Sequence, residues 1–359
     1  MPAAKPPFRP RTWLVAVSAL ALAALGGALA PAHAADIDSA MLAGVTGVGI
    51  HNTYNDKTDY TYLADALDAG ASLIELDTWA NVLNGKWDVS HDNPFASNNN
   101  CVQATTGADL YTGNRNQNLD SCLDDIRIWM LAHPTHGPIM VKIEMKNGFY
   151  DPLGMNPTEF DGYVKAHLGS TLYTPADLLT KPDGTMYPNL DAAAQANNWA
   201  TYGSLEGKVI VEMIPGTFEQ AVEPSSTWVD VVYAQHLLDL YNSGDIANAA
   251  IFPSVLGAQA GDPRARYSDS ALRPWFVVFD GDAGTWVNDG ATQWYNTNHY
   301  LAVVTDAQDV APALSDTAPT LADAQARVAE LAADGASFIS TDWNTAPANA
   351  VLREVLPRG

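Results

Sequence analysis

The stretch Ile139-Met140-Val141-Lys142-Ile143-Glu144-Met145 places charged side chains between apolar ones with a period of two. Successive side chains of a β-strand point to opposite faces, so Lys142, Glu144 and the following Lys146 share one face. The apolar residues between them share the other face. The pattern predicts a buried strand that packs against the core on one side and presents charged groups on the other.

Short apolar runs of this kind recur along the chain, and segments of helical periodicity lie between them. About eight buried strands alternating with helices predict a single parallel (β/α)8 barrel of the TIM type over residues 35–359. A doubly wound open sheet is the competing fold, but no G-x-G-x-x-G motif follows the first run. The expected strands are 45–50, 72–77, 139–145, 208–213, 250–255, 275–280, 300–304 and 337–341, and the clearest helices 62–69, 120–131, 158–167 and 320–333.

Residues 1–34 have the pattern of a secretory signal peptide. Three cationic residues precede an apolar stretch at 13–30, and Ala32-His33-Ala34 provides the small-x-small cleavage pattern. We therefore expect cleavage after Ala34 and a secreted protein. An uncleaved membrane anchor is the alternative, although the apolar stretch is short for a transmembrane helix.

The charge balance narrows the classes of partner. The 359 residues include 41 acidic and only 18 basic ones, which gives a formal net charge of −23. A protein that binds nucleic acid needs a basic surface, so we do not expect this protein to bind nucleic acid. Attachment to an anionic membrane by charge alone is disfavoured for the same reason.

The chain contains two cysteines, Cys101 and Cys122. In an exported protein an isolated pair is most simply a disulfide bond. Two free or metal-binding thiols are the alternative, but no residues with zinc-ligand spacing lie near them.

Polar residues end the first predicted strands, and the active sites of parallel barrels lie at that end. Three carboxylates and an amide brought together there form an all-oxygen site that suits calcium or magnesium rather than zinc or copper. Two histidines beside such a metal can donate and remove protons, and lysines on the adjoining face can hold a phosphate. The set indicates metal-assisted attack on a phosphodiester. Its members are His51, Asn52, Glu75, Asp77, His91, Lys142, Glu144 and Lys146.

The motifs His51-Asn52-Thr53-Tyr54, Ile74-Glu75-Leu76-Asp77-Thr78-Trp79, Val89-Ser90-His91 and Lys142-Ile143-Glu144 resemble the phosphoinositide-specific phospholipase C superfamily. Among its branches the chain looks most like the secreted, calcium-dependent bacterial one. The final Gly335–Asp342 segment is similar to the last strand of this barrel group.

The resemblance implies one calcium ion bound by Asn52, Glu75, Asp77 and Glu144, with magnesium less favoured. It implies attack of the inositol 2-hydroxyl on phosphorus, which releases diacylglycerol and a cyclic inositol phosphate that can then be hydrolysed. Glu75 is the expected base. His91 is expected to stabilise the phosphorane and His51 to protonate the leaving group, although the two histidines can be exchanged in this scheme.

Two other functions stay open. The glycerophosphodiester phosphodiesterase and sphingomyelinase D-like groups have a similar barrel and E-x-D pair, but the former typically opens with His-Arg-Gly, where this chain has His51-Asn52-Thr53. A non-catalytic, secreted calcium- or glycan-binding barrel is the second alternative. For each enzyme the partner is a phospholipid or other phosphodiester, at a membrane surface in the lipid case, and we expect a monomer without a protein partner.

Overall fold

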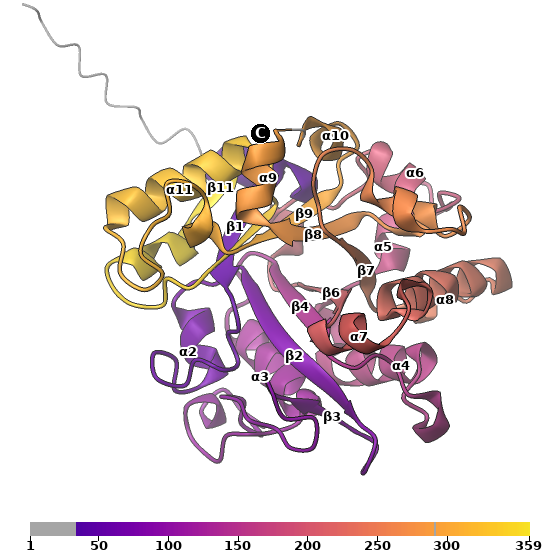
Figure 1. The fold of residues 1–359 in the computed structure, drawn as a ribbon, viewed down its shortest axis with the longest axis horizontal. Coiled ribbons are helices and arrows are strands. Elements are labelled where there is room, and N and C mark those ends of the chain that lie inside the picture. The colour runs from indigo at the N-terminus through magenta and orange to yellow at the C-terminus, as the bar shows by residue number, and fades with distance from the viewer. Residues whose placement is uncertain (1–33, 291) are drawn as a thin grey trace, which may run out of the picture.

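The computed structural model describes residues 34–290 and 292–359, and eight parallel strands in this part of the chain close into a barrel (Figure 1). The predicted barrel is confirmed. The leader predicted at residues 1–34 lies outside the described residues except for Ala34, and it stays a prediction. The barrel strands, in spatial order, are β1 (Val45–Ile50), β2 (Leu73–Asn81), β4 (Ile139–Met145), β6 (Val209–Pro215), β7 (Phe252–Leu256), β8 (Val278–Asp282), β9 (Leu301–Thr305) and β10 (Phe338–Thr341), which pairs with β1.

Helices surround the barrel, as alternation of strands and helices requires (Figure 1). The four segments predicted as helices are helical in the structure, as α2, α3, α4 and α11. The described helices are α1 (Ala34–Ser39), α2 (Leu63–Asp68), α3 (Leu119–Ala132), α4 (Pro157–Leu168), α5 (Pro175–Leu179), α6 (Leu190–Gln195), α7 (Thr217–Val222), α8 (Val229–Ser243), α9 (Ala283–Asp289), α10 (Gln293–Thr297) and α11 (Leu321–Ala333).

Local sequence signals set several helix ends. Asn156 caps α4 because its side chain accepts a hydrogen bond from the Glu159 amide, and proline occupies the first helical position. Thr320 caps α11 in the same way. At its C-terminal end α8 stops at Gly244, whose φ of 85° belongs to the left-handed region that glycine adopts without strain.

Three short strands lie outside the barrel proper: β3 (Lys86–Val89), β5 (Leu172–Tyr173) and β11 (Val355–Pro357). β3 pairs antiparallel with β2, so the two form a hairpin, and β11 pairs antiparallel with β1. The sequence pattern did not indicate them, because strands of two to four residues are too short to show a period. The predicted run 275–280 is also shortened in the structure, where Arg273–Trp275 form a 3-10 turn before β8.

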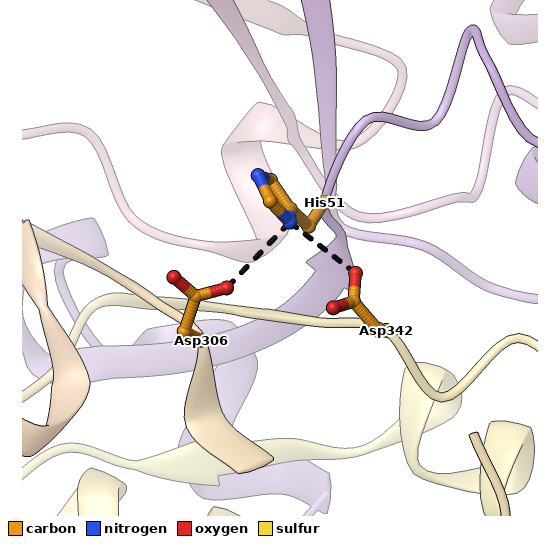
Figure 2. Close-up of side chains that lie close together, drawn as sticks. All are labelled: His51, Asp306 and Asp342. Atoms are coloured by element: carbon orange, nitrogen blue, oxygen red, sulfur yellow. Dashed lines mark hydrogen bonds and ion pairs between the residues drawn. The ribbon is translucent and has the colours of Figure 1, made fainter. Parts of the chain in front are cut away.

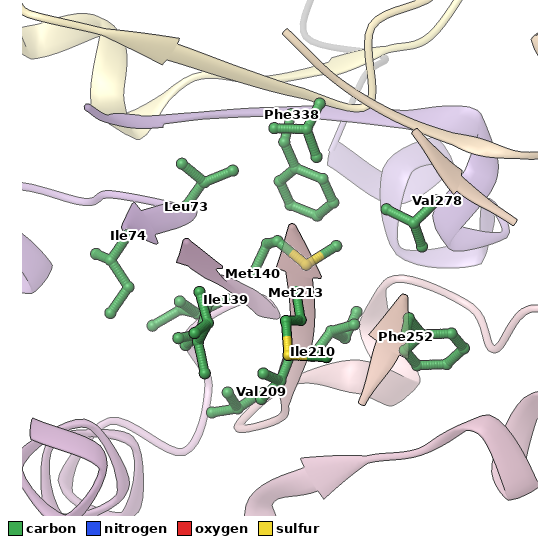
Figure 3. Packing of buried hydrophobic residues seen from close by; sticks show 14 of the residues in the cluster. Leu73, Ile74, Ile139, Met140, Val209, Ile210, Met213, Phe252, Val278 and Phe338 are labelled. Atoms are coloured by element: carbon green, nitrogen blue, oxygen red, sulfur yellow. The ribbon is translucent and has the colours of Figure 1, made fainter. Parts of the chain in front are cut away.

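The pairing of residues between neighbouring strands arranges the side chains inside the barrel in layers. Leu73 pairs with Met140, and two residues further on Glu75 pairs with Lys142, which in turn pairs with Glu212. Directly paired residues lie on one face of a sheet, so an apolar layer lies below a polar layer. Figure 3 shows part of this packing, in which Phe338 and Met140 are among the buried side chains.

Close approach of β1 and β2 requires glycine at position 49. A Cβ atom there would lie 2.1 Å from the carbonyl oxygen of Leu73. The backbone of β1 can therefore pack tightly against β2, which brings the end of β1 beside the carboxylates of β2.

None of the helices in the described ranges has the length and apolar character needed to cross a membrane.

Candidate active site and metal site

The predicted site residues gather at one end of the barrel, where the parallel strands terminate. His51 and Asn52 directly follow β1, Glu75 and Asp77 lie in β2, and Glu144 lies near the end of β4. Asp77 and Glu144 are direct partners in the register of β2 with β4. Residues 67 positions apart in sequence are thereby placed side by side.

Three carboxylates form a cluster at this end, two of them buried and one half-buried. Glu75, Asp77 and Glu144 each contribute an oxygen, and these atoms all lie within 4.8 Å of one another. Burial raises the pKa of Asp77 to about 7, and the negative charges of Glu144 and Glu75 add to this effect. The Oδ1 atom of Asp77 is buried and has no hydrogen-bond partner among the described residues. Clustered carboxylate oxygens with an unsatisfied buried acceptor fit a hard cation such as Ca²⁺.

Asn52 lies against this cluster in a strained backbone conformation. Its φ is 50°, in the left-handed region, where asparagine is one of the few non-glycine residues found. Its backbone amide donates to Glu75 Oε2 at 3.1 Å, and its side-chain Oδ1 accepts from the Tyr54 hydroxyl at 3.3 Å. Strain of this kind concentrates at functional sites because the surrounding contacts must enforce it.

Both predicted phosphate-binding lysines form ion pairs with these carboxylates. Lys142 Nζ lies 3.3 Å from Glu75 Oε1 and 2.9 Å from Asp280 Oδ2. Lys146 Nζ lies 3.0 Å from both Asp77 Oδ2 and Glu144 Oε1. Burial opposes the charged form of each lysine, but the adjacent carboxylates outweigh it and raise both pKa values. The lysines therefore balance the acidic cluster, a role that alternation along the strand did not reveal.

His51 is held by two acidic residues from the far end of the chain (Figure 2). Its Nδ1 lies 3.2 Å from Asp342 Oδ1, just after β10, and 3.6 Å from Asp306 Oδ1, just after β9. Burial lowers the pKa of His51, but the hydrogen bond with Asp342 and the charges of Glu75, Asp342 and Asp306 raise it to about 9. The imidazole is therefore a cation at neutral pH, suited to donate a proton.

Gln308 joins the two acidic residues that face His51. Its Nε2 donates to Asp342 Oδ2 at 2.9 Å and to Asp306 Oδ1 at 3.2 Å. Asp306 has a φ of 62°, a second strained position at the mouth of the barrel. The sequence analysis assigned no role to these three residues, although Asp342 ends the motif that resembles the last strand of the barrel group.

His91 reaches the cluster from the β2–β3 hairpin rather than from the end of a barrel strand. Its Nδ1 lies 3.1 Å from Asp77 Oδ2 and 3.3 Å from the Tyr54 hydroxyl, and its side chain is 46% exposed. The expectation that all the polar residues end successive barrel strands is wrong for His91, because the run before it is β3. His51 and His91 nevertheless both lie next to the cluster, His51 beside Glu75 and His91 beside Asp77.

Further buried polar residues lie deeper in the barrel. Glu212 is fully buried, and burial together with the charge of Asp280 raises its pKa to about 8, although Lys142 opposes the shift. A hydrogen bond with the Ser254 side chain acts on this pKa in the same direction as Lys142. A neutral Glu212 would limit the negative charge that Lys142 must balance.

Cys101 and Cys122 form a disulfide bond, as predicted. The bond joins the segment after the hairpin to α3. Neighbouring asparagines connect this segment to the site, since the Asn100 amide donates to the Tyr54 carbonyl at 2.9 Å and Asn99 Nδ2 donates to the Val89 carbonyl at 2.9 Å. The disulfide-linked segment therefore supports the backbone that carries Tyr54 and His91.

A parallel barrel with a carboxylate cluster and two histidines at the mouth formed by the carboxyl ends of its strands is the arrangement expected of a barrel phosphodiesterase. A profile of the family described as phosphoinositide phospholipase C, Ca2+-dependent, matches residues 60–222. A Ca2+-dependent phosphatidylinositol-specific phospholipase C from Streptomyces antibioticus is 48% identical, with a TM-score of 0.84 over 89% of this chain and 99% of that one. The chain belongs to this family of calcium-dependent phospholipases C, and it is a phosphoric diester hydrolase.

More distant structures share the fold. A calcium-dependent phosphoinositol-specific phospholipase C from a Gram-negative Pseudomonas species, in complex with myoinositol, is 20% identical, with a TM-score of 0.64 over 90% of this chain and 97% of that one. An apo crystal form of the Pseudomonas enzyme is 21% identical, also with a TM-score of 0.64, over 89% and 96% of the two chains. A comparison with curated proteins finds no match.

Proposed function

We propose that this protein cleaves phosphatidylinositol into diacylglycerol and a cyclic inositol phosphate, with one Ca²⁺ bound by Asn52, Glu75, Asp77 and Glu144. The observation that carries the proposal is the carboxylate cluster with the unsatisfied, buried Oδ1 of Asp77, which has a histidine next to two of its members. Calcium is preferred over magnesium because the family is calcium-dependent, and because magnesium is usually bound through only one or two carboxylates whereas this cluster offers three. A bound Ca²⁺ would lower the pKa of the attacking hydroxyl and neutralise charge on the phosphoryl oxygens.

The residues around the cluster supply the proton transfers. The charges of Lys142 and His51 hold the pKa of Glu75 below its usual range despite burial, so Glu75 is ionised and can accept the proton of the inositol 2-hydroxyl. His51, a cation at neutral pH, donates a proton to the departing diacylglycerol oxygen. His91, next to Asp77, stabilises the charge that develops on the phosphoryl oxygens.

The substrate reaches the site from a lipid surface. Apolar side chains are exposed beside the mouth, among them Leu83 at 74%, Phe95 at 57% and Phe218 at 49%. An apolar pocket of about 370 Å³ lies between the β2–β3 hairpin, the loop after His91 and α7. Since the net charge of −23 repels an anionic membrane, apolar contact is the means of attachment that the chain offers.

The leader pattern at residues 1–34 supports a secreted enzyme. All the residues named above come from one barrel, which supports action as a monomer without a protein partner.

Phosphorus NMR of the protein with phosphatidylinositol micelles, with calcium and with a chelator, tests this function. We expect a calcium-dependent signal of cyclic inositol phosphate. Absence of any phosphorus product in both samples, together with cleavage of glycerophosphoinositol to glycerol phosphate, would contradict it.

A further inference from the structure

A second pocket lies at the opposite end of the barrel from the carboxylate cluster. It encloses about 410 Å³ and is lined by the chain before β1, by residues from α10 to the start of β9, and by the C-terminal residues after β11. Arg358, His299, Asn296 and Asn197 are among the polar residues that line it. The active-site residues contribute nothing to this pocket, so the proposed function does not account for it.

Arg358 is a buried cation with no ion-pair partner among the described residues. It is 9% exposed, and three of its donors reach backbone carbonyls: Nε reaches Gly335 at 2.6 Å, and Nη1 reaches Ala43 at 2.8 Å and Tyr300 at 2.7 Å. Its Nη2 has no hydrogen-bond partner in the described part of the chain. Burial lowers the pKa of the guanidinium to about 9, so the group is still charged at neutral pH.

Three further polar groups in the lining lack partners within the described ranges. They are His299 Nδ1, Asn296 Oδ1 and Asn197 Oδ1, all of them buried. The oxygen and nitrogen of an asparagine amide are exchanged by a rotation of the side chain, so each asparagine can present either a donor or an acceptor. Buried polar groups are normally satisfied, so four such groups around a single pocket favour a polar occupant there.

His299 is also held in an unusual conformation. Its φ is 55°, in the left-handed region, and Trp199 Nε1 donates to its backbone carbonyl at 2.7 Å. The contact with the buried Trp199 fixes the backbone of His299 at the edge of the pocket. Strained positions of this kind are maintained where the side chain has a task.

We propose that this pocket is a binding site for a small oxyanion such as phosphate, bound by the Arg358 guanidinium with His299 and the two asparagine amides beside it. The N–H groups of Arg358 Nη2 are the guanidinium donors that are left for phosphate oxygens, and hydrogen bonds from a charged donor to phosphate are strong. Arg358 already connects the segments before β1, β9 and β10 through the three carbonyls. A bound anion stabilises the closure of the barrel at this end, without contact with the catalytic residues.

Thermal unfolding of the full chain in chelator, with increasing inorganic phosphate and with sodium chloride at matched ionic strength, tests the site. A ligand that binds only the folded state raises the unfolding temperature as its concentration passes the dissociation constant. We expect a saturable rise with phosphate but not with chloride. Arg353→Gln, a change of an arginine outside this pocket, should preserve the rise. Arg358→Lys and His299→Asn should abolish or strongly reduce it, and phosphodiesterase activity should be retained in both.

His299→Asn keeps the test decisive if Arg358→Lys does not fold, because asparagine tolerates the left-handed backbone. Inositol 1-phosphate serves as a second probe, and it distinguishes free phosphate from the phosphate group of a reaction product. Binding of either probe that depends on Arg358 or His299 supports the site. The proposal is overturned if neither probe raises the unfolding temperature above the chloride control. It is equally overturned if the rise is unchanged in the folded pocket variants, since the anion would then bind elsewhere.

Discussion

At the scale of single residues, the site depends on charges that are balanced by contacts far apart in sequence. Asp342 and Asp306 face Nδ1 of His51, and Glu75 faces its Nε2. A histidine between carboxylates keeps its proton at neutral pH and is fixed in orientation. The proton donor of the proposed reaction is therefore prepared by residues that do not touch the phosphate themselves.

Asp342→Asn should lower kcat by roughly 10²–10⁴-fold, because it removes the carboxylate that orients and charges His51 while preserving side-chain size. Steady-state assays on phosphatidylinositol with saturating calcium would measure this effect. Asp316→Asn, a change of an exposed acid outside the site, is the matched control and should leave kcat unchanged. Equal activity of the two variants would remove Asp342 from the catalytic arrangement.

At the scale of elements, the disulfide-linked segment between the hairpin and α3 supports the site from outside the barrel. Asp125 of α3 accepts hydrogen bonds from the Val102 amide at 2.6 Å and the Ala104 amide at 3.1 Å, so it fixes the chain directly after Cys101. The covalent bond and these hydrogen bonds hold the same stretch of backbone.

The double variant Cys101→Ser/Cys122→Ser should lose about 3 kcal/mol of unfolding free energy, since the bond closes a loop of about 20 residues in the unfolded chain. Denaturant unfolding measures the loss, and turnover well below the unfolding transition should stay near that of the parent. A variant of unchanged stability would show that the bond does not restrict the unfolded state. Loss of turnover in a fully folded variant would instead give the segment a direct part in the reaction.

Asp125 should make stability depend on pH. Burial raises its pKa to about 7, although the two backbone amides act in the opposite direction. A carboxyl whose pKa is higher in the folded state binds more protons when folded, so its contribution to the unfolding free energy decreases as the pH rises from about 4 to about 7. Asp125→Asn should flatten the measured dependence over that interval. An unchanged slope would contradict the assignment.

At the scale of the whole molecule, an acidic protein must reach a lipid substrate without electrostatic attraction. The exposed apolar side chains of the β2–β3 hairpin, the loop after His91 and α7 are all at the end of the barrel that holds the site. This arrangement lets the mouth face the membrane while the rest of the acidic surface stays in water.

Phe95→Asp should therefore reduce activity on phosphatidylinositol vesicles by about tenfold or more, because a charge replaces an apolar contact with lipid. Activity on a short-chain, monomeric phosphatidylinositol should be nearly unchanged. Leu131→Asp is the matched control, because Leu131 is also 57% exposed but lies on α3, away from the mouth. Equal losses on both substrates would place Phe95 in the chemistry rather than in membrane contact.

Much of this architecture is predictable from the sequence. The elements that were not predicted were missed for physical reasons. The eight barrel strands are largely buried runs of four to nine residues, and most of them are long enough for burial and period to identify them. β3 is a four-residue strand with one exposed end, and its pairing with β2 depends on the hairpin rather than on its own pattern. The position of His91 was misassigned for this reason.

The candidate site, too, can be predicted from the sequence only in part. Glu75, Asp77 and Glu144 belong to two long, periodic strands, so their shared face can be predicted from alternation. The contact of His51 with Asp342 spans 291 residues, and no local pattern encodes it. The two lysines illustrate a different limit, since alternation places Lys142 and Lys146 on the charged face but does not tell which carboxylates they pair with.

The central claim is that the carboxylate cluster binds one calcium ion, and calorimetric titration of calcium into the protein tests it most directly. We predict a stoichiometry of one and an affinity that falls by about tenfold or more in Asp77→Asn, because ligand charge sets the strength of a calcium site. Asp92→Asn, a change of an exposed acid beside His91, should bind calcium like the parent. Equal affinities in Asp77→Asn and the parent, with both folded, would contradict the assignment of the site.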